Sequence, residues 1–218
     1  LISIVGFIAF SLAASLVYIV NDLFDIQTDR LHATKKHRPF ASGEVGAASG
    51  LALASVLALV LAVLCWAMPL AASLLLVCYL VSAFGYSIYI KRLLFADVVL
   101  LAGFYTLRIL FGGAVINVQI SIWTLALSMF LFLTLALSKR ITDLRGTLDH
   151  STTEISGRGY KSADLPQLAS LASASGYLAV LVMALYINSP EVTLLYKRPQ
   201  FLWAICPLLI YWISRVLI

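Results

Sequence analysis

Long apolar runs constrain this chain more than any other feature. A bilayer core of about 30 Å is spanned by about 20 apolar residues in an α-helix, and the sequence contains seven such runs. Because backbone polar groups find no water inside lipid, runs of this length predict a helical bundle. The composition agrees, since 62% of the residues are hydrophobic and 11% are charged, against about 25% charged in soluble domains. We expect an all-α integral membrane protein with helices over residues 1–20, 47–67, 70–90, 95–115, 120–137, 168–187 and 201–218.

The chain begins and ends inside apolar runs, at Leu1 and Ile218, without an initiating Met. We therefore expect residues 1–218 to form one transmembrane domain that is part of a longer protein. The three cysteines are scattered through apolar segments, which predicts packing roles and no disulfide framework. The three histidines are not spaced as metal ligands.

The charged residues of the connections predict the orientation in the membrane. Eleven Lys and Arg residues lie in the first, third and fifth connections, and only Lys197 and Arg198 lie in the others. By the positive-inside rule the basic connections are cytoplasmic. Nine of the ten acidic residues lie in or beside the same connections, so we expect chemistry at the cytoplasmic mouth. The net charge of +5 reflects topology and anionic lipid, and it does not indicate nucleic-acid binding.

The first apolar run ends in an acidic pattern, NDxxDxxxD, made by Asn21, Asp22, Asp25 and Asp29. If the helix continues past Val20, the three carboxylates fall at i, i+3 and i+7 and share one face with the asparagine. Hard oxygen donors at a membrane mouth suit Mg²⁺, which binds few carboxylates and keeps positions open for phosphate oxygens. The three aspartates are therefore predicted metal ligands.

A basic segment follows the acidic pattern directly and contains Lys35 and Arg38. Acidic and basic side chains next to each other predict a site for a metal-bridged polyanion. The alternative is a solvated helix end followed by an ordinary positive-inside loop. We favour the functional interpretation because the carboxylates keep helical spacing.

The third connection and the helix after it carry Tyr86, Lys91, Asp97 and Arg108. The arginine has the angular position of the aspartate to within about 20° and lies roughly 16 Å deeper along the helix. A charge at that depth faces a polar cavity or bonds to backbone carbonyls. We favour the cavity.

The fifth connection opens with Lys139, Arg140 and Asp143. These residues form either a second anion-binding group or a helix-end ion pair, since the basic residues precede the aspartate by four and three positions. Asp149 is out of step with a shared face. The polar stretch of about 25 residues that ends near Tyr160 predicts an irregular lid or binding loop.

Together these motifs resemble the UbiA prenyltransferase superfamily, whose hallmark is similar to the NDxxDxxxD pattern. The segment HATKKHRPFASG, the pair Tyr86 and Lys91, and the sequence KRITD at 139–143 look most like the decaprenyl-phosphate phosphoribosyltransferase branch. The resemblance implies nine helices around a central cavity, of which this chain would lack the first and last. It also implies that Mg²⁺ and the donor diphosphate bind at the acidic face. Prenyl-transferring members usually carry a second DxxxD motif, whereas this chain has only Asp143 at that place, which fits the phosphoribosyl branch better.

The expected function is Mg²⁺-dependent transfer of an organic group from a diphosphate donor to a lipidic acceptor, with the active site facing the cytoplasm of a bacterial inner membrane. The narrower expectation is phosphoribosyl pyrophosphate as donor and polyprenyl phosphate as acceptor. Predicted catalytic residues are Asp22, Asp25, Asp29 and Asp143. Predicted substrate-binding residues are Asn21, Lys35, Arg38, Tyr86, Lys91, Asp97, Arg108, Lys139 and Arg140.

Three alternatives stay open at this stage. A prenyl diphosphate could be transferred to an aromatic ring of the quinone, haem or chlorophyll type. A transporter would use intramembrane charges in its pathway, although the sequence lacks the clear internal repeats typical of that class. A purely structural membrane subunit would leave the acidic face without a role.

Overall fold

The computed structural model describes residues 1–31, 35–149 and 159–218, without the side chains of 147–149 and 193. This part of the chain is α-helical with a few 3₁₀ turns and no strands. Contacts within the chain divide it into two compact units, Leu1–Ser87 with Leu110–Gln119, and Ile88–Ile109 with Ile120–Ile218. Each unit is described by itself below, and the predicted single domain stays a prediction.

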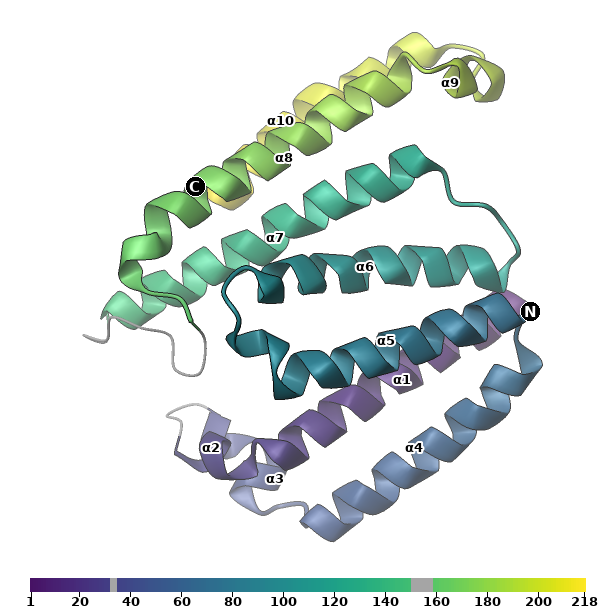
Figure 1. The fold of residues 1–218 in the computed structure, drawn as a ribbon. Coiled ribbons are helices and arrows are strands. Elements are labelled where there is room, and N and C mark those ends of the chain that lie inside the picture. The colour runs from purple at the N-terminus through teal and green to yellow at the C-terminus, as the bar shows by residue number, and fades with distance from the viewer. Residues whose placement is uncertain (32–34, 150–158) are drawn as a thin grey trace. The chain divides into compact units, whose positions relative to one another are not determined.

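The first unit is built on α1 (Ile2–Phe24), which packs against α4 (Ala47–Ala67) (Figure 1). It also contains α2 (Ile26–Arg30), η1 (Lys35–His37), α3 (Pro39–Ser42), α5 (Leu70–Ile88) and the end of α6 (Ala96–Val115). The ring of Phe10 lies 4.6 Å from that of Tyr79 and 5.2 Å from that of Phe111. A Cβ at Gly50 of α4 would lie 2.6 Å from the ring of Phe40. This glycine therefore lets α3 pack closely on α4.

The second unit is built on α7 (Ile122–Asp149) and α8 (Leu165–Ile187), which run side by side (Figure 1). Around them lie most of α6, η2 (Ile90–Arg92), η3 (Ser162–Asp164), α9 (Pro190–Leu195), η4 (Pro199–Ala204) and α10 (Ile205–Leu217). A Cβ at Gly176 would lie 2.6 Å from Ile213 Cγ2, so this glycine permits close approach of α8 and α10. A buried apolar cluster that includes Val98, Leu144 and Leu168 forms one core of the unit.

The predicted transmembrane helices are confirmed within the described residues. Seven helices are long and apolar enough to span a membrane, namely Ile2–Phe24, Ala47–Ala67, Leu70–Ile88, Ala96–Val115, Ile122–Gly146, Ser162–Ile187 and Pro199–Leu217. The protein is an all-α integral membrane protein, as the sequence predicts.

The structure corrects one boundary that matters for the site. The fifth helix was expected to end near residue 137, but α7 continues to Asp149. Hydropathy marks where a helix leaves the apolar layer, whereas the helix itself ends where its backbone bonding ends. Residues 139–143 therefore lie on a helix, and the predicted irregular stretch of about 25 residues is shorter. Its middle, residues 150–158, and the side chain of Asp149 lie outside the described residues.

Candidate functional site

The acidic pattern lies where α1 gives way to α2. The helix continues past Val20, as expected, and then breaks at Asp25, whose φ and ψ are −92° and 4°. The backbone N–H of Asp25 still donates to Asn21 O at 2.9 Å, and that of Asp29 donates to Asp25 O at 2.8 Å. Helical hydrogen bonding thus continues through the break, so that Asp29 lies one turn after Asp25.

Two of the carboxylates converge on one arginine. Arg38 Nη1 lies 2.9 Å from Asp22 Oδ1 and 2.9 Å from Asp29 Oδ2. The Asp29 side chain is 4% exposed and that of Arg38 is 41% exposed, so a buried carboxylate is neutralised by a cation that still reaches solvent. The predicted side-by-side placement of acid and base is present here.

Local structure explains how Arg38 reaches both carboxylates. It precedes α3 with extended backbone angles of −65° and 146°, and Pro39 begins that short helix. Arg30 Nε donates to Ala41 O at 3.0 Å, which ties α2 to α3. The packing of Phe40 against Gly50 fixes α3 from the other side. Arg38 is therefore held between anchored segments.

The donor set fits a hard cation. Asp22 and Asp29 already share a positively charged group, and Asn21 Oδ1 is a buried oxygen that makes no hydrogen bond within the described part of the chain. Among the described residues, no three His, Cys, Asp or Glu side chains form a ready-made metal site. Two carboxylates with phosphate oxygens completing the coordination are typical of Mg²⁺. Asp25 is half-buried and Lys35 is exposed beside this group.

The second unit contains a buried polar network whose members the sequence did not predict to contact one another. Asp97 is 0% exposed, and Arg140 and Tyr160 are each 1% exposed. The Tyr160 hydroxyl donates to Asp97 Oδ1, and Arg140 Nη2 lies 3.1 Å from Asp97 Oδ2. Arg140 Nη1 in turn donates to Asp143 Oδ2 at 2.9 Å. One guanidinium therefore links a buried carboxylate to a second one that is 39% exposed.

Tyr160 also supports the backbone at the start of α6. Phe95 has a φ of 63°, which is unusual for a residue with a side chain. Its N–H donates to the Tyr160 oxygen at 3.1 Å, so that oxygen both accepts and donates. Burial raises the pKa of Tyr160, and its hydrogen bond to Asp97 raises this pKa further. The hydroxyl is accordingly a protonated donor at neutral pH.

The network changes how three predicted residues are interpreted. Asp97 and Arg140 were expected to bind substrate, but both are enclosed and paired with each other. Arg140 and Asp143 form the ion pair that their spacing allows, and the roles of Asp97, Arg140 and Asp143 toward substrate stay predictions. Lys139 is exposed, and within the described residues it makes no ion pair with Asp143. Sequence spacing could not find the network because 43 positions separate Asp97 from Arg140.

The remaining predicted residues lie elsewhere in the chain. Arg108 is exposed, and its guanidinium carbon lies 5.8 Å from the centre of the Tyr105 ring. Thus Asp97 and Arg108, which were expected to share a face, have different surroundings. Tyr86 and Lys91 are half-buried near the end of α5 and in η2. Their roles toward substrate stay predictions.

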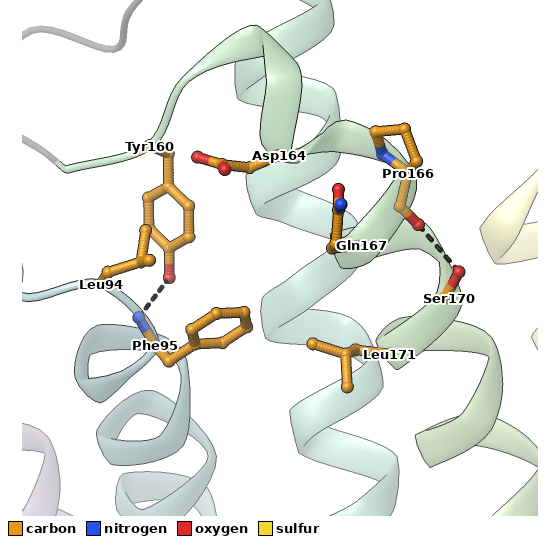
Figure 2. Close-up of a pocket in the computed structure, with 8 residues that line it drawn as sticks. All are labelled: Leu94, Phe95, Tyr160, Asp164, Pro166, Gln167, Ser170 and Leu171. Atoms are coloured by element: carbon orange, nitrogen blue, oxygen red, sulfur yellow. Dashed lines mark hydrogen bonds between the residues drawn. The ribbon is translucent and has the colours of Figure 1, made fainter.

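A pocket of about 540 Å³ lies beside the network in the second unit. Figure 2 shows Tyr160 on its wall, with the hydroxyl pointing to the backbone nitrogen of Phe95. The lining contains one carboxylate and, among the described residues, no Lys or Arg, so it is not suited to a diphosphate. The lining residues are Leu94, Phe95, Tyr160, Asp164, Pro166, Gln167, Ser170 and Leu171.

Relatives support the assignment that the motifs suggest. The protein is 34% identical over 218 residues to the uncharacterized protein y4nM of Sinorhizobium fredii, covering 97% of this chain and 41% of the relative. It is 30% identical over 141 residues to a protein of Mycolicibacterium smegmatis named decaprenyl-phosphate phosphoribosyltransferase, covering 65% of this chain and 44% of that protein. The chain thus spans less than half the length of both relatives.

The fold is also similar to that of a solved structure. A UbiA homolog from Archaeoglobus fulgidus, solved bound to DMAPP and Mg²⁺, superposes with a TM-score of 0.77 at 16% identity, covering 99% of this chain and 74% of the other. At this identity the match shows the fold alone. The sequence profile of the UbiA prenyltransferase family matches residues 1–217. The chain therefore belongs to the UbiA prenyltransferase family.

Proposed function

We propose that this protein is a Mg²⁺-dependent intramembrane transferase that ionises a diphosphate donor and passes its organic group to a lipidic acceptor. The observation that carries the proposal is the convergence of Asp22 and Asp29 on Arg38. Carboxylates for a divalent cation and a cation for phosphate lie within one group, at the end of a membrane-spanning helix. This combination matches what departure of a diphosphate requires, which is neutralisation of negative charge.

Different residues of the chain would bind the metal and the phosphate groups. Asp22, Asp25 and Asp29 would hold Mg²⁺, which supplies charge neutralisation for the leaving diphosphate when bound. Arg38 would turn from the two carboxylates to the phosphate oxygens, since guanidinium binds both groups well. Lys35, exposed on η1, would add a second positive charge.

The organic group would leave as a cation, either a ribosyl oxocarbenium ion or an allylic carbocation. Both react with water, so the protein must keep water from the donor until the acceptor attacks. The long apolar helices suit this task. The basic connections favour a site that opens to the cytoplasm.

The narrower proposal is phosphoribosyl pyrophosphate as donor and polyprenyl phosphate as acceptor. Two observations favour it: the 30% identity to a relative named decaprenyl-phosphate phosphoribosyltransferase, and the buried Arg140 beside Asp143, where a prenyl-transferring member would carry further acidic groups. The second candidate is a prenyl diphosphate donor, favoured by the fold match to a homolog bound to DMAPP.

A donor screen tests both candidates. Membranes containing the full protein are incubated with labelled phosphoribosyl pyrophosphate or with labelled prenyl diphosphate, with and without a Mg²⁺ chelator. We expect the phosphoribosyl label to enter the lipid fraction in a chelator-sensitive reaction. Transfer of only the prenyl label would select the second candidate, and transfer of neither label would contradict the proposed activity.

A further inference from the structure

The hydroxyl of Tyr160 stands at the buried end of a line of polar contacts. It donates to Asp97, Asp97 pairs with Arg140, and Arg140 donates to Asp143. Exposure changes along the line, since the first three residues are at most 1% exposed while the Asp143 side chain is 39% exposed. Asp143 is thus the most exposed member of the line.

The buried ion pair is not in its best geometry. Asp97 Oδ2 and Arg140 Nη2 are 3.1 Å apart, yet neither Asp97 Oδ2 nor Arg140 Nε makes a hydrogen bond within the described part of the chain. A carboxylate and a guanidinium prefer two parallel hydrogen bonds when nothing else holds them. Here Tyr160 occupies the other oxygen of Asp97, and Asp143 occupies the other terminal nitrogen of Arg140. The guanidinium is therefore shared between two carboxylates.

We propose that Tyr160 is a positioning residue that acts through Asp97 and Arg140 to fix the Asp143 carboxylate. While the Tyr160 hydroxyl occupies one oxygen of Asp97, Asp97 binds the Arg140 guanidinium through one nitrogen only. Arg140 Nη1 therefore remains bound to Asp143. The catalytic role of Asp143 rests on the proposed function. The contacts that position it belong to the protein alone.

Replacement of Tyr160 by Phe separates this role from simple packing. The ring contributes to the buried cluster with Val98 and Leu168, and Phe keeps that ring while it removes the hydroxyl. Without the hydroxyl, Asp97 is free to engage Arg140 through two nitrogens, and the contact between Arg140 and Asp143 weakens. A purely structural hydroxyl would lower stability without affecting Asp143.

The first test uses metal-free protein and needs no activity. Thermal unfolding of the full protein in detergent with a chelator is measured for wild type, Tyr160→Phe, Asp143→Asn and the double variant. We expect Asp143→Asn to lower the midpoint clearly less in the Tyr160→Phe background than in wild type, because its partner has already moved. Additive shifts would overturn the inference, since unconnected sites behave additively.

The second test measures catalysis with the donor that the screen identifies. In Tyr160→Phe we expect kcat at saturating donor and Mg²⁺ to fall about tenfold while the KM for the donor changes little, which is the lower end of the usual effect of removing a residue that orients a functional side chain. The same change in the Asp143→Asn background should have no further effect. Tyr177→Phe is the matched control, because its hydroxyl is exposed and lies 3.4 Å from Ser214 Oγ.

An unchanged kcat in Tyr160→Phe would contradict the inference. If Tyr160→Phe fails to fold, Arg140→Lys takes its place, because an ammonium cannot bridge both carboxylates as the fork does, and we expect the same tenfold fall in kcat. If wild type transfers neither donor, the proposed function fails, while the metal-free unfolding cycle still decides the positioning role.

Discussion

Arg38 and Mg²⁺ should compete for the same carboxylates in protein without donor. We therefore expect Arg38→Gln to bind Mg²⁺ more tightly than wild type, although it removes a residue of the proposed site. The same variant should bind the donor diphosphate more weakly, because the phosphate loses its guanidinium. Opposite changes for metal and donor distinguish competition from general damage to the site.

The size of the effect follows from the two contacts of 2.9 Å. Charge-assisted hydrogen bonds contribute about 1.5–3 kcal/mol each when shielded from water. The Arg38 side chain is 41% exposed, so solvent screening reduces this sum substantially. We take about 1.5 kcal/mol for displacement of the guanidinium, which corresponds to about tenfold tighter Mg²⁺ binding.

Calorimetric titration of MgCl₂ into detergent-solubilised, donor-free protein measures this change. Lys36→Gln is the matched control, since it removes one positive charge from the same connection and its side chain is exposed on η1. Lys36→Gln should change Mg²⁺ affinity little. Equal affinities for wild type and Arg38→Gln, or equal gains in both variants, would refute the competition.

Three further predictions concern packing, pH and topology. Gly176→Val should destabilise the protein by about 1–3 kcal/mol because the new side chain overpacks against Ile213, whereas Gly85→Ala meets nothing within 4 Å and should leave the unfolding midpoint nearly unchanged. The raised pKa of Tyr160 means that its contribution to stability is complete below about pH 10 and is lost as pH rises further, so Tyr160→Phe should show a shallower alkaline decline in unfolding midpoint than wild type. A Cys placed at Ser42 in a cysteine-free background should be labelled from the cytoplasmic side, and labelling only from the outer side would reverse the orientation.

The helices of this protein were predictable because the constraint on them is local. Each span must be about 20 residues long and apolar whatever its neighbours are, and the seven runs reappear as seven helices. The acidic face was predictable for a similar reason, since helical spacing alone places Asp22 and Asp29 on one face, two turns apart. Their joint contact with Arg38 was not, because it depends on the break at Asp25 and on α3 packing near Gly50.

The contacts within the buried network could not be predicted from the sequence. The sequence predicts Asp97 and Arg140 as separate substrate-binding residues, and nothing in their spacing indicates that they contact each other. Only the fold brings α6 and α7 together so that the two residues neutralise each other. Tyr160 carried no signal at all, since it followed a glycine in a stretch expected to be irregular.

The most direct test of the central claim is the transfer rate of single acidic variants at equal membrane expression. Asp22→Asn and Asp29→Asn keep the size of each side chain but remove the charge that would hold Mg²⁺. We expect each to lower the rate at least about 100-fold. Glu191→Gln, an exposed acidic residue in the connection between α8 and η4, should retain the wild-type rate. Full chelator-sensitive transfer by Asp22→Asn and Asp29→Asn would contradict the assignment of this acidic face as the centre of the reaction.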